Sequence, residues 1–196
     1  HFWKKWTPLD IRKSLEYLEQ AISLDENFAQ AYSALSGCYV YLGAFGQMPS
    51  SIAYPKGKEY ALKALELDNS LPDSHLSIAM VNFFNWNWEE SYKSFIKTLE
   101  LNPNNAEAHQ YFAYYMLAFG NTKKAVAEAE KALEIDPLSI PVNSSLAETY
   151  AHCGLFELAK EQFLRTLELD NNFRSALNGL GWTLYFLGET DEAISR

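Results

Sequence analysis

The sequence has few cysteines and no long apolar run. Its 196 residues include only Cys38 and Cys153, which lie far apart in the chain. This usage gives no support for a disulfide framework and favours reduced thiols in a cytoplasmic setting. The longest strongly apolar stretch extends only from Tyr111 to Phe119, whereas a helix needs about 20 apolar residues to span a bilayer. We therefore expect no membrane-spanning segment and no membrane partner.

Basic residues are also scarce compared with acidic ones. Lys and Arg total 16 against 25 for Asp and Glu, which gives a net charge of −9. An excess of negative charge repels the phosphate backbone of nucleic acids. We therefore expect that this segment does not bind nucleic acid.

What the sequence does contain is a repeated motif. Hydrophobic residues make up 48% and aromatic residues 15% of the chain, enough for a substantial core. The motif Leu-Glu-Leu-Asp and its close variants end on the apolar residues Leu67, Leu101, Ile135 and Leu169, each 34 residues after the last (101 − 67 = 34). An earlier copy ends at Leu24. A constant step of this size is typical of an array of helix pairs.

The repeat predicts one all-α array over 1–196, in which each unit is a helix, a turn and a second helix. The expected units are about 1–28 (partial), 29–71, 72–105, 106–139, 140–173 and 174–196 (partial). Gly120, Gly154 and Gly188 recur at the turns, as glycine does where a helix ends in left-handed backbone. Because His1 is not an initiator Met and 1–7 is aromatic and basic, we expect a fragment of a longer chain.

Two places depart from the period. Residues 44–53 are an insertion between the helices of the 29–71 unit, where Gly43 is predicted to end the first helix and Tyr54-Pro55 to begin the second. This loop is a possible binding element. Trp86 stands in the place of the turn glycine, and we expect the flanking asparagines to provide the left-handed backbone.

The repeated positions resemble the signature of the tetratricopeptide repeat (TPR) family. The resemblance is carried by Leu146-Ala147 with Tyr150, Leu180-Gly181 with Leu184, Ala159 with Phe163, Ala125 with Ala129 and Ala132, and the terminal Pro103 and Pro137. It implies a right-handed superhelix of antiparallel helix pairs that acts as a protein-binding scaffold. Departures such as Asn82 at a tyrosine position affect only packing detail.

A narrower resemblance involves the run 84–90 (Phe-Asn-Trp-Asn-Trp-Glu-Glu), followed by 101–104 and 136–139. These segments are similar to the repeat arrays of certain multidomain bacterial signalling and transcription-regulator proteins. In those proteins the repeats are joined to winged-helix, nucleotide-cyclase or kinase domains. The resemblance implies a scaffolding segment of a larger regulator.

The first helix of each unit is expected to carry the binding residues, because stacked pairs leave one stripe of it on a concave face. Helical spacing assigns to this face Tyr41, Met80, Phe84, Gln110, Tyr111, Tyr114, Glu148, His152, Asn178, Trp182 and Tyr185. The stripe is aromatic and nearly free of positive charge. It therefore lacks the basic clamp with which members of the resembled family grip acidic C-termini, and favours an apolar or aromatic peptide or protein segment.

No pattern in the sequence predicts catalysis, a metal site or a cofactor. His75 and His109 occupy equivalent repeat positions, but neither has cysteine or carboxylate ligands in register. Glu128 and Glu130 are expected on the solvated face of a second helix, where neighbouring residues do not form an acid–base pair. The segment is therefore not expected to be an enzyme.

Two alternatives remain open at this point. The partial last unit, 174–196, leaves an apolar face without its usual cap, which would suit a self-associating or spacer module that forms a homodimer. The chain would otherwise be the regulatory segment of an enzyme whose catalytic domain lies elsewhere.

Overall fold

The computed structural model describes residues 8–189 and 191, and all regular structure in them is helical. The helices are α1 (Pro8–Leu24), α2 (Ala29–Ala44), α3 (Ser50–Leu67), α4 (Pro72–Phe84), α5 (Trp88–Leu101), α6 (Ala106–Ala118), α7 (Thr122–Ile135), α8 (Ile140–His152), α9 (Phe156–Leu169) and α10 (Arg174–Leu187). The all-α prediction is confirmed. The interpretations of 1–7 and of 192–196 lie outside the described residues.

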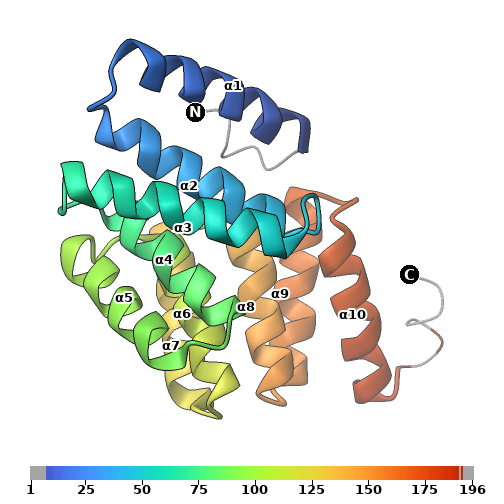
Figure 1. Ribbon diagram of the computed structural model, residues 1–196. Coiled ribbons are helices and arrows are strands. Elements are labelled where there is room, and N and C mark those ends of the chain that lie inside the picture. The colour runs from blue at the N-terminus through green and yellow to red at the C-terminus, as the bar shows by residue number, and fades with distance from the viewer. Residues whose placement is uncertain (1–7, 190, 192–196) are drawn as a thin grey trace. The chain divides into compact units, whose positions relative to one another are not determined.

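The chain divides into two compact units, His1–Pro103 with α1 to α5 and Asn104–Arg196 with α6 to α10 (Figure 1). In the first unit α2 packs on α3 and α4 on α5, and α2 also lies beside α4. In the second unit α6 packs on α7 and α8 on α9, while α10 packs on α9. The continuity of one array across 1–196 stays a prediction.

The helix pairs begin where the sequence period places them. First helices start at Ala29, Pro72, Ala106, Ile140 and Arg174, the positions at which the predicted units begin. Polar residues cap two of these starts: the side chain of Asn105 accepts a hydrogen bond from the Ala108 N–H and that of Ser139 from the Val142 N–H. At α6 and α8, local capping and the 34-residue period therefore define the same boundary.

The turns after the first helices share one geometry. Gly120, Gly154 and Gly188 have φ values of 68°, 75° and 82°, and in the first of these turns the Asn121 N–H donates to the Met116 carbonyl at 2.9 Å. The α4–α5 turn makes the same bond, from the Asn87 N–H to a carbonyl one turn back in α4 at 2.8 Å. The glycines thus supply the left-handed backbone that this bond requires.

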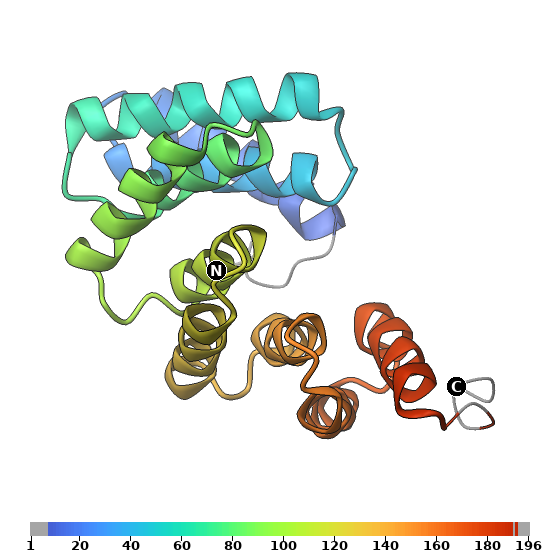
Figure 2. The same ribbon diagram turned by 90° about the horizontal axis from the view of Figure 1, so that it is seen from below.

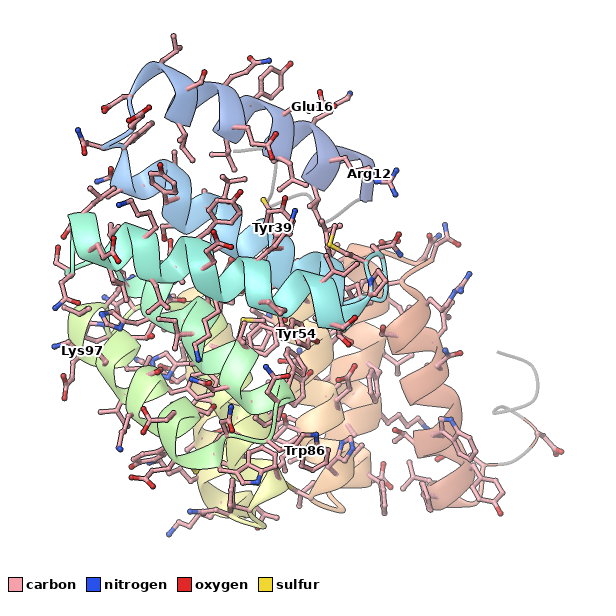
Figure 3. The ribbon with its side chains drawn as sticks, in the orientation of Figure 1. Arg12, Glu16, Tyr39, Tyr54, Trp86 and Lys97 are labelled. Carbon is pink, nitrogen blue, oxygen red and sulfur yellow. The ribbon has the colours of Figure 1, made fainter. Side chains whose placement is uncertain are left out.

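In the α4–α5 turn the left-handed residue is Trp86 itself, with φ 64°. The prediction that its neighbours take this conformation is wrong, because Asn85 and Asn87 have φ values of −94° and −86°. The hydrogen-bond pattern fixes which position is left-handed, and the asparagines lie on either side of it. Trp86 is 75% exposed (Figure 3). Its ring meets that of Trp88 edge to face at 5.2 Å.

The predicted helix ends around the 44–53 insertion are also wrong. α2 continues past Gly43 to Ala44, and the left-handed residue after it is Gly46, with φ 66°. α3 begins at Ser50, so Pro55 lies inside its first turns rather than at its start. Gly43 has a packing role instead, since a Cβ there would lie 2.6 Å from the ring of Tyr54. Only 45–49 form the loop between the two helices.

Small residues allow the paired helices of the second unit to approach closely. Ala147 and Ala159 are fully buried in a core that also contains Phe163 and Leu180. The ring of Phe163 fills the space above Gly179, where an added Cβ would lie 2.3 Å from Cζ. α9 and α10 can therefore pack this closely only because Gly179 has no side chain.

We expect opposite effects from alanine at two glycines whose surroundings have room for a methyl group. Gly37 lies inside α2 and Gly120 in a left-handed turn, and an added Cβ meets nothing within 4 Å at either site. Gly37→Ala should raise the free energy of unfolding by about 0.5–1 kcal/mol by restricting the unfolded chain. Gly120→Ala should lower it by about 1 kcal/mol because of the left-handed backbone.

Urea unfolding followed by circular dichroism measures both changes. Shifts of the same sign in the two variants would contradict this explanation of the turn.

Candidate functional site

Eight of the predicted binding residues lie on three neighbouring first helices of the second unit. We call them the aromatic stripe: Gln110, Tyr111 and Tyr114 on α6, Glu148 and His152 on α8, and Asn178, Trp182 and Tyr185 on α10. α8 packs against both α6 and α10 (Figure 2). The 34-residue period therefore places equivalent side chains on adjacent helices of one unit.

The other three predicted residues take part in the packing of the first unit. Tyr41 and Met80 are only 3% and 2% exposed. Phe84 is partly buried, and its ring stacks on that of Tyr54 at 5.3 Å between centroids. A ligand would reach these side chains only after the unit had repacked, so the aromatic stripe is defined without them.

The centre of the aromatic stripe is a hydrogen-bonded pair. The Tyr114 hydroxyl donates to Glu148 Oε2 at 2.7 Å, across positions one repeat apart. The Ser144 hydroxyl donates to Glu148 Oε1 at 3.3 Å, so both carboxylate oxygens accept bonds from neutral groups. Burial, followed by the nearby Glu148 charge, raises the pKa of Tyr114 well above its ordinary value of 10.0. Tyr111 meets the Tyr114 ring edge to face at 6.1 Å.

The α10 end of the aromatic stripe is open to solvent. Trp182 and Tyr185 are 67% and 58% exposed, and their rings meet edge to face at 6.4 Å. Phe186, also exposed, stacks on Phe156 of α9 at 5.1 Å. Large exposed aromatic groups in contact with one another form a surface that a protein segment could bury.

Two polar members of the aromatic stripe are accessible as well, whereas Gln110 and Glu148 are partly buried. His152 and Asn178 are exposed, and the His152 ring nitrogen Nδ1 lies 2.7 Å from the backbone oxygen of Glu148 in its own helix. That contact holds the imidazole along α8 and leaves the neighbouring carboxylate to Tyr114 and Ser144.

Of the two acidic residues expected on a solvated face of α7, Glu130 is exposed and Glu128 is partly buried. Glu128 Oε2 lies 2.6 Å from the His109 ring, and the two side chains are only 16% and 12% exposed. Glu130 accepts a hydrogen bond from the Tyr150 hydroxyl at 2.9 Å, and burial together with this carboxylate raises the pKa of Tyr150 to about 12. The expectation for Glu128 is wrong. Helical spacing shows on which side of α7 Glu128 lies, but it does not show that His109 of the paired helix α6 contacts that side.

Within the part of the chain that the structure describes, no group of three or more His, Cys, Asp or Glu residues is placed to hold a metal ion. His75 instead has a ring nitrogen 3.3 Å from the Asn69 carbonyl oxygen. Cys38 and Cys153 are free thiols, and burial raises the pKa of Cys38 to about 12, which disfavours the reactive thiolate. Among the described helices, none combines the length and apolarity needed to cross a bilayer.

The Tyr114–Glu148 bond predicts a loss of stability at alkaline pH. Because the folded-state pKa of Tyr114 is raised above the unfolded value, the stabilisation is complete below about pH 10 and is lost as the pH rises towards the folded-state pKa. Urea denaturation should therefore show a falling free energy of unfolding above about pH 10. Tyr114→Phe should make this fall smaller, while costing about 1 kcal/mol at neutral pH for the lost hydrogen bond. Equal pH dependence in both proteins would contradict the assignment.

Comparison with known proteins identifies the repeat. Residues 94–127, from α5 into α7, match the family model described as Tetratricopeptide repeat. Transcriptional regulator HilA of Salmonella typhimurium is 25% identical over 174 residues, which are 88% of this chain and 32% of HilA. The chain thus spans about a third of the length of that relative.

Two solved structures share the fold. PilF of Pseudomonas aeruginosa has a TM-score of 0.71 at 22% identity, covering 87% of this chain and 73% of PilF. YrrB, a TPR protein described as having an unusual peptide-binding site, has a TM-score of 0.58 at 19% identity, covering 92% of this chain and 89% of YrrB. These likenesses show that the described helices have the tetratricopeptide-repeat fold. The family match over 94–127 agrees with the 34-residue period of the helix pairs.

Proposed function

We propose that the chain binds a peptide or protein segment along the aromatic stripe and is the regulatory part of a larger bacterial signalling protein. The observation that carries this proposal is the exposed Trp182–Tyr185 pair, on a helix that packs beside the one carrying Glu148. Proteins with tetratricopeptide repeats generally mediate protein–protein interactions and act as scaffolds rather than catalysts. We therefore place the function in recognition.

The chemistry of the aromatic stripe favours an apolar or aromatic partner. Tyrosine and tryptophan bury much area while freezing few rotatable bonds, which is why they dominate the energetics of many interfaces. α6 and α8 contain no lysine or arginine, and α10 contains only Arg174, its first residue. Nothing on these helices provides the basic cluster that an acidic C-terminus would need.

The relatives support the regulatory part of the proposal. HilA is a transcriptional regulator, and about two thirds of it lies outside the match with this chain. YrrB is described as having a peptide-binding site on the same fold. We infer that the present chain provides recognition for output domains of a larger regulator, in the cytoplasm.

Truncation of the two exposed rings tests the proposal. Peptides selected from a displayed random library by this chain would be measured by fluorescence anisotropy against Trp182→Ala, Tyr185→Ala and the double variant. We expect the double variant to lose affinity about tenfold or more, since exposed aromatic anchors contribute over 1 kcal/mol each when they become buried. Because both side chains are exposed, circular dichroism should show an unchanged fold.

The matched control is Tyr17→Ala, which removes an exposed ring from α1 of the first unit, a helix that carries no residue of the aromatic stripe. Its affinity should equal that of the wild type. Unchanged affinity in the Trp182→Ala/Tyr185→Ala protein would refute the binding site.

Self-association is the second candidate, and the same helix supports it. Trp182, Tyr185 and Phe186 together expose three large rings on α10, and a second copy of the chain could cover them. Light scattering across a concentration series separates the two functions, because a monomer at high concentration counts against a homodimer.

A further inference from the structure

We propose that the segment bound by the aromatic stripe carries a lysine or arginine side chain that pairs with Glu148. This inference rests on the proposed function and adds the chemical class of the partner at one position. Three observations support it: the hydrogen bonds that orient Glu148, the lack of lysine and arginine on α8, and the aromatic rings of the stripe.

Among the residues that the structure describes, none provides Glu148 with a cationic partner, and two hydrogen bonds orient its carboxylate. It is partly buried, and the hydroxyls of Tyr114 and Ser144 donate to its two oxygens. These neutral donors orient the group but leave its negative charge uncompensated. In the described residues no lysine, arginine or histidine side chain forms an ion pair with Glu148.

Other carboxylates of the chain contrast with it. Three glutamates on second helices pair with lysines of the same helix: Glu66 with Lys63, Glu90 with Lys93 and Glu134 with Lys131. Those groups are largely exposed, and such surface pairs contribute little to stability. Glu148 has no such neighbour, because α8 contains no lysine or arginine.

A cation brought by a partner would meet favourable conditions at Glu148. A carboxylate that is partly removed from water attracts a nearby charge more strongly than an exposed one, since the effective dielectric constant is lower. Oxygens already oriented by two hydrogen bonds lose little freedom when a charged donor binds. An acidic segment would be repelled by the same charge.

The rings of the aromatic stripe suit the same cation. Tyr114 touches Glu148 directly, and Trp182 holds the equivalent position one repeat later on α10 (182 − 148 = 34). The faces of tyrosine and tryptophan attract ammonium and guanidinium groups. A basic side chain flanked by apolar ones would therefore satisfy both the carboxylate and the rings.

The test is a double-mutant cycle on a peptide selected by the wild-type chain from a displayed random library. The selected peptides should share a lysine or arginine beside apolar residues. Replacing that residue by glutamine should weaken binding to the wild type by about five- to tenfold, the range of a partly desolvated charge pair. The same replacement should have no effect on binding to Glu148→Gln, which keeps an oxygen acceptor for Tyr114.

The control is Glu168→Gln, which removes an exposed carboxylate from α9 and should retain the full effect of the peptide replacement. Added salt should lower the affinity of the wild type for the basic peptide more than it lowers the affinity of Glu148→Gln.

The outcomes distinguish this inference from the proposed function. If selection gives apolar peptides without a basic residue, or if the basic residue contributes equally to binding by the wild type and by Glu148→Gln, the pairing is wrong, whereas loss of binding in Trp182→Ala would still support the aromatic stripe. If selected peptides bind the Trp182→Ala/Tyr185→Ala protein as well as the wild type, the proposed function is wrong and the inference falls with it.

Discussion

The close approach of paired helices is the constraint on which the rest of this structure depends. Helices pack at short range only where side chains at the crossing are small, and the chain places Ala147, Ala159 and Gly179 at such points. The space they leave is filled by one large side chain, as Phe163 shows against Gly179. Because the fit is tight, each repeat has little freedom in its spacing, and this explains why the motif returns every 34 residues.

The turn between paired helices follows from the same constraint. A helix that must reverse within a few residues and still satisfy its last carbonyls needs one left-handed residue at a fixed position. Glycine meets this need at Gly120, Gly154 and Gly188 without strain. Trp86 meets it at a steric cost of about 1–2 kcal/mol for a residue with a side chain, which shows that the packing of α4 on α5 is strong enough to impose the backbone.

Most of the fold could be predicted from the sequence because it is governed by short-range patterns. The starts of the five first helices, α2, α4, α6, α8 and α10, follow from the repeat, and the side-chain caps of α6 and α8 are local. The errors occur where contacts with another helix determine the structure. Gly43 packs against Tyr54 of α3 and does not end α2. Glu128 contacts His109 of the paired helix. The site was less predictable for the same reason. One periodic rule selected both the buried Met80 and the exposed Trp182, because helical spacing identifies a face but not what covers it.

Charge is divided between the two kinds of helix in a way that separates stability from recognition. Lys63, Lys93 and Lys131 lie on second helices and pair locally with glutamates of their own helix, whereas Lys160 of α9 pairs with Glu189 just after α10. The first helices α6 and α8 have neither lysine nor arginine, so neither of these helices supplies a lysine or arginine to neutralise the charge of Glu148. Second helices can therefore share the Leu-Glu-Leu-Asp motif and its variants, since they have the same packing role in every unit. First helices are free to differ, and their differences determine what the aromatic stripe can bind.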